Sequence, residues 1–96
     1  MPAVTRVGDN DTGHDLCPPR PLDTGSGDVF VNSIQCGRQS DSYVPHGCIV
    51  HAPHSGIIAT GSATVYVNSL QVGRIGDPVS CGGSVAVGSG NVYAGG

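Results

Sequence analysis

Short runs in which apolar and polar residues alternate recur along the chain and predict brief β-strands. In the clearest run, DVFVN at residues 28–32, a valine stands at every second position. Asn32-Ser33 interrupts this run as a predicted tight turn, because Asn adopts left-handed backbone conformations more readily than most residues. A second short strand follows at residues 34–36, so the whole stretch predicts a hairpin.

This hairpin belongs to a stretch that the chain contains twice. Residues 24–41 and 60–77 align without a gap at a spacing of 36 residues, and 11 of the 18 positions are identical. A shorter version, VGSGNVYAGG, closes the chain at residues 87–96, and VTRVGD at residues 4–9 matches the end of the stretch. A repeat of this kind predicts an architecture built from similar units.

Counting from the Arg-x-x-Asp end of the repeat divides the chain into three units. These ends are Arg6–Asp9, Arg38–Asp41 and Arg74–Asp77, and each is followed by a loop and then by Gly-Ser and a valine-rich strand. Because the chain begins late in one unit and ends early in another, three units can close around one axis, which also protects strand edges. We therefore expect an all-β, small conical pseudo-threefold domain of short strands and hairpins, with residues 1–96 as a single domain.

The composition agrees with this fold class. Val and Ile together number 18 against three Leu, and the chain has no Glu and no Lys, so good helix formers are scarce. The 16 Gly and seven Pro are suited to turns. A chain of 96 residues with such small apolar side chains has a thin core, and proteins of this kind commonly need a disulfide, a metal or a partner subunit.

Charge and hydrophobicity exclude several classes of function. The net charge of −3, with four Arg and no Lys, offers no basic patch, so we expect no nucleic-acid partner. No apolar run approaches the roughly 20 residues of a membrane-spanning helix. The N-terminus, MPAVTRVGDN, has no apolar segment of the kind found in secretory signals, so any export is expected to use another route.

Each unit places a candidate metal ligand soon after its Asp. His14 and His46 lie five residues past that Asp, and Cys81 lies four residues past it. Equivalent positions in three units converge near the axis, and His54, or alternatively His51, can add a fourth ligand from the longest loop. Three His and one Cys are a normal ligand set for zinc, so we expect one structural Zn²⁺ with no open coordination position.

These residues also have simpler interpretations. A single loop His is usually a solvated polar residue, and the equivalent placement in three units is what favours a metal. The four Cys could instead form disulfides, and Cys17 and Cys48 could pair, although this is the less favoured interpretation. Cys36 stands where the second copy has Val72, which predicts a small buried side chain.

The remaining repeated polar residues are expected to be structural. The Arg and Asp of each unit are interpreted as turn and ion-pair residues. Ser26, Ser62 and Ser89 follow Gly in all three units and have no nearby base, so they are interpreted as turn residues and not nucleophiles. A zinc hydrolase would need an open site and a general base, but the chain has no HExxH motif and no Glu, so we expect no enzyme.

The ordered set of motifs resembles the PAAR-repeat proteins, which are the tips of phage tail spikes and type VI secretion spikes. The resemblance spans the chain and is carried by Gly8-Asp9…His14, Gly25-Ser26…Val29-Phe30-Val31-Asn32, Gly37-Arg38…Asp41…His46, Gly61-Ser62…Val65-Tyr66-Val67-Asn68, Gly73-Arg74-Ile75-Gly76-Asp77…Cys81-Gly82-Gly83 and Gly88-Ser89…Val92. The tetrapeptide that names the family is replaced by Gln35-Cys36-Gly37-Arg38 and Gln71-Val72-Gly73-Arg74, in which only the Arg survives.

This resemblance implies a small cone with a zinc ion bound by three His and one Cys near the vertex. Its broad base would sit on a trimeric β-helix spike, one copy per trimer, and contraction would drive the tip through a target-cell outer membrane. The chain is most similar to the single-domain tips of T-even phages, which implies a place in the virion, or secretion by a type VI system. We expect the valines Val29, Val31, Val65, Val67 and Val92 to lie at or just inside the spike-binding base. The alternative is a small secreted binding module that is disulfide-stapled or zinc-dependent.

Overall fold

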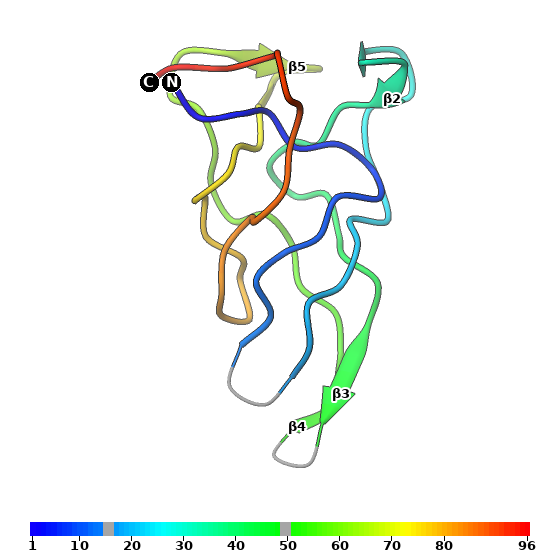
Figure 1. The fold of residues 1–96 in the computed structure, drawn as a ribbon. Coiled ribbons are helices and arrows are strands. Elements are labelled where there is room, and N and C mark those ends of the chain that lie inside the picture. The colour runs from blue at the N-terminus through cyan, green and yellow to red at the C-terminus, as the bar shows by residue number, and fades with distance from the viewer. Residues whose placement is uncertain (15–16, 49–50) are drawn as a thin grey trace.

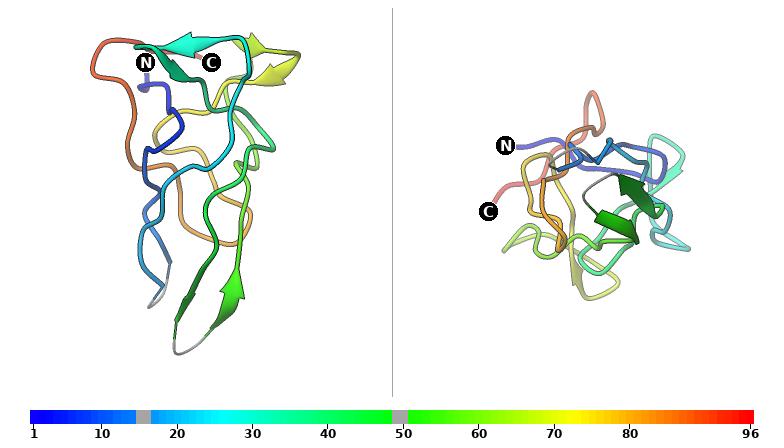
Figure 2. Two further views of the ribbon diagram at one scale, coloured as in Figure 1. Left: turned by 90° about the vertical axis from the view of Figure 1, so that its right-hand side faces the viewer. Right: turned by 90° about the horizontal axis from the view of Figure 1, so that it is seen from below.

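The computed structural model describes residues 1–14, 17–48 and 51–96, with the side chains of 47, 48 and 51–53 left out of the description. The molecule is elongated, with principal extents of 37 × 23 × 23 Å. It is broad at the end that carries both termini and narrows toward the opposite end (Figures 1 and 2). The two equal short axes are what a threefold arrangement of units produces. The prediction of an all-β conical domain is confirmed, and no helix in the described part of the chain could span a membrane.

Two equivalent hairpins form the broad end. In the first, β1 (Phe30–Val31) pairs with β2 (Ile34–Gln35), and in the second, β5 (Tyr66–Val67) pairs with β6 (Leu70–Gln71). Each is closed by a two-residue Asn-Ser turn with positive φ at both positions, 55° and 65° in the first and 53° and 65° in the second. This is the type I′ geometry that matches the twist of paired strands, so the predicted turns are confirmed.

A third hairpin forms the narrow end. In it, β3 (His46–Cys48) pairs antiparallel with β4 (His51–His54) (Figure 1). The register of this pair places His46 opposite His54. The sequence did not predict strands here, because the stretch contains two prolines and no alternation of apolar residues. The pairing is nevertheless what carries this loop to the end of the molecule.

A closed ring of main-chain hydrogen bonds surrounds the axis and shows the threefold arrangement directly. The amide of Thr5 donates to the carbonyl of Gly73 at 3.0 Å, that of Gly37 to Thr5 at 2.9 Å, and that of Gly73 to Gly37 at 3.0 Å. These three residues each precede the repeat Arg of their unit. Three units in one chain therefore meet as three subunits would in a symmetric trimer.

Side chains also link the units around the axis, with donors and acceptors following one another in the opposite sense to the main-chain ring. In each copy of the repeated stretch a buried Ser hydroxyl accepts two backbone N–H groups of its own turn and donates to an acceptor in the next copy, and the Arg of the same copy as the Ser donates to that same acceptor. We call these contacts the inter-unit latches. Their members are Ser26 and Arg38 on Asn68 Oδ1, Ser62 and Arg74 on the Gly95 carbonyl, and Ser89 and Arg6 on Asn32 Oδ1. The predicted roles of the repeat Ser and Arg are confirmed, and each Arg also forms an ion pair with its Asp.

The interior consists of two apolar clusters, one on each side of the axial ring. The cluster toward the broad end contains Val4, Val31, Cys36, Val72 and Ala94. The cluster toward the narrow end contains Leu22, Tyr43, Ile58, Val79 and Val85. Both consist mainly of small or medium side chains, so the thin core expected for this chain is what the structure has.

Candidate metal centre

Four side chains meet where the loops of the three units converge at the narrow end. His14, His46, His54 and Cys81 bring their ligand atoms within 4.8 Å of one another, in an arrangement that could hold a metal ion. His14 comes from the first loop, His46 and His54 come from the second, and Cys81 comes from the third. His46 is buried and the other three are half-buried.

The β3–β4 hairpin supplies two of the four groups. Directly opposed residues of an antiparallel pair project from the same face, and His46 and His54 are such a pair. Their Nε2 atoms lie 3.0 Å apart, and the rings meet edge to face with centroids 4.5 Å apart. The main-chain pairing therefore fixes the spacing of these two imidazoles.

His14 and Cys81 are placed by tight turns. His14 exchanges main-chain hydrogen bonds with Cys17 at 2.8 and 3.2 Å, and its Nε2 lies 2.9 Å from that of His54 and 3.0 Å from that of His46. Cys81 precedes Gly82 and Gly83, whose φ angles of 115° and 73° are accessible mainly to glycine. Gly83 accepts a hydrogen bond from the amide of Val79, which closes the turn around Cys81.

The three Nε2 atoms are better arranged to bind a cation than to hydrogen-bond to one another. His46 Nδ1 lies 2.8 Å from the carbonyl oxygen of Pro18, which can only accept, so Nδ1 carries the proton and Nε2 presents a lone pair. In a triangle with edges of 2.9–3.0 Å, neutral imidazoles cannot satisfy all three Nε2 contacts with hydrogen bonds. A metal ion among them accepts all three lone pairs at once.

The donor set and its dimensions are those of a zinc site. Donors around a tetrahedral zinc ion with Zn–N distances near 2.0–2.1 Å lie about 3.3–3.4 Å apart, a few tenths of an ångström more than the Nε2 triangle. The hydrogen bond from His46 to Pro18 is the outer contact that usually orients a ligating imidazole. Four protein donors would fill a tetrahedron, and such an ion cross-links loops without offering a position for substrate.

The structure brings together His14, His46, His54 and Cys81, the four residues of the favoured ligand set. The side chain of His51, the alternative fourth ligand, lies outside the described residues, as does that of Cys48. Cys36 is buried and free, as expected, and Cys81 is also free. Cys17, however, is disulfide-bonded, so the preference against disulfides was wrong for this residue.

Sequence reasoning missed the polar groups beneath the cluster. Arg20 is 2 % exposed, and it donates to the carboxylate of Asp11, the carbonyl of His54 and the sulfur of Cys81. Arg20 stands between two prolines in a polar loop, which is also the pattern of a solvated arginine. Its neighbours are far apart in sequence, so no local signal indicates its burial.

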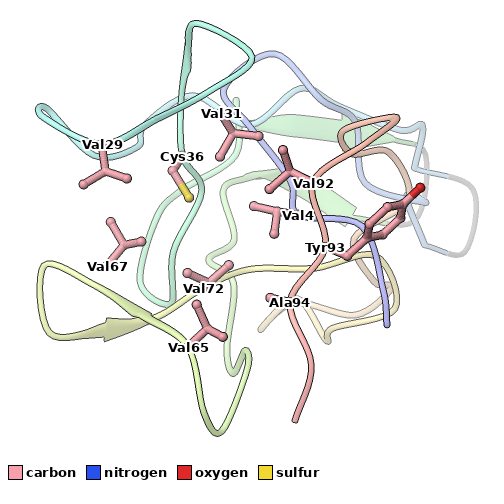
Figure 3. A pocket seen from close by; sticks show the side chains of 10 residues that line it. All are labelled: Val4, Val29, Val31, Cys36, Val65, Val67, Val72, Val92, Tyr93 and Ala94. Carbon is pink, nitrogen blue, oxygen red and sulfur yellow. The ribbon is translucent and has the colours of Figure 1, made fainter.

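The opposite end of the molecule contains an apolar hollow of about 150 Å³. All five valines expected at the base line it, together with Val4, Cys36, Val72, Tyr93 and Ala94 (Figure 3). They come from equivalent positions of the three units, so the hollow is surrounded by three similar walls. Three equivalent aromatic residues, Phe30, Tyr66 and Tyr93, directly follow Val29, Val65 and Val92 in the chain and are each more than half exposed.

Comparison with known proteins agrees with this description. A search of curated proteins found no match to the chain. A family model described as PAAR motif matches residues 12–87, which include most of the first loop, the other two loops, the four residues of the candidate metal centre and both complete repeats. The chain belongs to the PAAR-motif family.

Proposed function

We propose that this protein caps a trimeric β-helical spike of a contractile tail, one copy per trimer, and helps the spike to breach the target-cell envelope. PAAR-motif proteins have a spike-tip role in contractile injection systems, including type VI secretion. The observation that carries the finer proposal is the pseudo-threefold broad end. One chain offers three similar surfaces there, around an apolar hollow. A trimeric partner with a blunt end would present the same symmetry.

The chemistry of the broad end supports docking. Val29 and Val65 are 36 % and 39 % exposed, and the equivalent aromatics Phe30, Tyr66 and Tyr93 are 52–55 % exposed. Large apolar side chains that are exposed at equivalent positions form a patch of the kind that a partner covers. Aromatic residues are also enriched in protein interfaces.

We further propose that the vertex holds one structural Zn²⁺ through His14, His46, His54 and Cys81. The ion would add folding free energy to the loops that meet at this end of the molecule. Elemental analysis of purified protein should give one zinc per chain. Removing it with a chelator should lower the melting temperature and increase amide hydrogen exchange in residues 42–57 more than in residues 24–41. Unchanged melting and exchange after complete metal removal would contradict a structural ion.

The docking proposal is tested by co-purification of the chain with a candidate trimeric β-helical spike. One chain per trimer is expected, and Val65→Gln should weaken the complex because it places an amide in the apolar wall. Ile75→Gln is a matched control. Ile75 is also 39 % exposed, and the first repeat already has Gln39 at the equivalent position. A complex with three chains per trimer, or equal binding by both variants, would contradict the proposed face.

A place in the virion or in a type VI machine belongs to the same proposal. The disulfide at Cys17 favours examining a second function, that of a small secreted binding module, because disulfides persist in oxidising compartments. The co-purification experiment separates the two. A module of that kind would not assemble with a trimeric spike at one copy per trimer.

A further inference from the structure

Arg20 lies directly beneath the His and Cys cluster and differs from the three repeat arginines. The side chains of the repeat arginines are 12–17 % exposed, whereas that of Arg20 is 3 % exposed. Its partner Asp11 has a fully buried carboxylate. An ion pair removed from water is costly unless both groups are fully hydrogen-bonded, so the partners of each group decide what the pair holds in place.

The guanidinium group of Arg20 contacts all three loops. Its Nε donates to Asp11 Oδ2 at 3.0 Å in the first loop, and Nη1 donates to the His54 carbonyl at 3.1 Å in the second. Its Nη2 donates to Cys81 Sγ in the third loop at 2.7 Å. Two of its three side-chain nitrogens thus contact residues of the candidate metal centre.

Asp11 also connects this arginine to His14. Its Oδ1 accepts the amides of Arg20 and Gly13, both at 3.0 Å. Gly13 is the residue before His14, so the carboxylate fixes the main chain from which that imidazole projects. Through one buried pair, the position of Cys81 is joined to the backbone at His54 and to the turn before His14.

The packing around the contact leaves no room for a side chain at position 56. A Cβ atom added to Gly56 would lie 2.6 Å from Arg20 Nη2 and 2.7 Å from Cys81 Sγ. The chain passes close to the contact between these two groups, and the residue at that point, Gly56, has no side chain. An alanine there would have to displace one group or the other.

We propose that Arg20 is a positioning residue for the metal centre, which holds the main chain of His54 in place and directs the sulfur of Cys81 toward the three imidazole nitrogens. The inference rests on the proposed metal site. A metal-bound sulfur carries negative charge in a partly buried place, and the guanidinium compensates that charge while fixing the sulfur's direction. Outer contacts of this type typically change metal affinity 10–100-fold when they are removed.

Arg20→Lys tests the role, because an ammonium group retains the charge opposite Asp11 but cannot bond three separated acceptors with the same fixed geometry. Zinc affinity is measured by competition with a chromophoric chelator, and the expected loss is 10–100-fold. The Co²⁺-loaded protein gives a second readout, since its sulfur-to-cobalt charge-transfer band should shift or weaken. Arg38→Lys is the matched control, because Arg38 forms the same kind of Asp pair at the broad end. It should leave affinity and band unchanged.

Gly56→Ala is the second variant, because it retains both Arg20 and Asp11 and places a methyl group against the contact between Arg20 Nη2 and Cys81 Sγ, with a Val79 methyl group 3.0 Å away. It should reproduce the spectral shift even if Arg20→Lys fails to fold. If the wild type binds metal, and Arg20→Lys or Gly56→Ala binds it with unchanged affinity and an unchanged charge-transfer band, the positioning role of Arg20 is overturned while the metal centre stands. A wild-type protein that binds neither Zn²⁺ nor Co²⁺ would overturn the metal centre itself, and the inference with it.

Discussion

The latch at Asn68 allows the contribution of one inter-unit contact to be measured. Asn68 Oδ1 accepts from Ser26 Oγ at 2.7 Å and from Arg38 Nη1 at 2.9 Å, while its Nδ2 donates to Asp28 Oδ1 at 2.9 Å. Replacing it with Gly removes all three contacts. Glycine adopts the native φ of 53° without strain, so the loss belongs to the side chain and not to the turn.

The expected loss of unfolding free energy is small because only one of the three partners, Ser26, is fully buried. Asp28 and the Arg38 head group regain water, so their bonds add little. Ser26 is fully buried, but its hydroxyl also lies 3.0 Å from Asp28 Oδ1 and keeps an acceptor there. The cost is therefore the net value of one hydrogen bond, about 1 kcal/mol, and not the larger penalty of an unsatisfied group. For a domain of this size, such a loss lowers the melting temperature by about 4–8 °C.

The pH dependence provides an independent check of the same latch. The bonds from Asn68 and then from Ser26 hold the pKa of Asp28 below its usual value of 3.8. A carboxyl group whose pKa is lower in the folded than in the unfolded protein adds stability at pH values above its unfolded-state pKa. That stability is lost as the pH falls through the pKa of the folded state. Asn68→Gly should therefore raise the pKa of Asp28 toward 3.8. The difference in the free energy of unfolding between Asn68→Gly and the wild type should therefore become smaller below about pH 4.

Thermal unfolding and a carboxyl NMR titration measure these two effects. Ser69→Gly controls for the change of residue type, because Ser69 is exposed and has a φ of 65° in the same turn. If Asn68→Gly has the same melting temperature as the wild type and the pKa of Asp28 is unchanged, the latch does not hold the units together.

Three further predictions concern the interior. Tyr43→Phe should leave the free energy of unfolding unchanged or raise it by about 1 kcal/mol, because no described group bonds the buried hydroxyl; a clear loss in chemical denaturation would contradict this. Gly37→Ala should cost about 1–3 kcal/mol, since its Cβ would lie 2.7 Å from a buried leucine methyl group, whereas Gly27→Ala, with nothing within 4 Å, should be close to neutral. Burial raises the pKa of Cys36 to about 11 from 9.0, so the protonated thiol stabilises the fold below pH 9 and that stability is lost as the pH rises toward 11. Cys36→Val, which copies Val72, should remove about 1.4 kcal/mol of this alkaline loss at pH 10, and equal pH profiles for both proteins would disprove it.

The repeat allowed much of the fold to be predicted from sequence. The Asn-Ser turns, the Arg–Asp pairs and the buried Ser residues are local features that recur in register, so each copy supports the interpretation of the others. The threefold count followed from the order of these features. It did not need the loops, whose lengths differ among the units.

The tip could not be predicted in the same way, because its contacts join loops that share no pattern. The His46–His54 pair depends on a hairpin in a stretch without apolar alternation. The burial of Arg20 depends on groups 9, 34 and 61 residues away along the chain. The disulfide at Cys17 is likewise not determined by the spacing of the cysteines in the sequence.

The third latch shows why the units need only be similar and not identical. Asn32 and Asn68 accept through their side chains, but the equivalent position in the third unit is Gly95, which has none. Its main-chain carbonyl receives the bonds from Ser62 and Arg74 instead. What the symmetry preserves is therefore the position of an oxygen atom, not the identity of a residue. The same tolerance applies at the vertex, where two loops supply imidazoles and the third supplies a sulfur, so a single chain can vary each unit and still close around one axis.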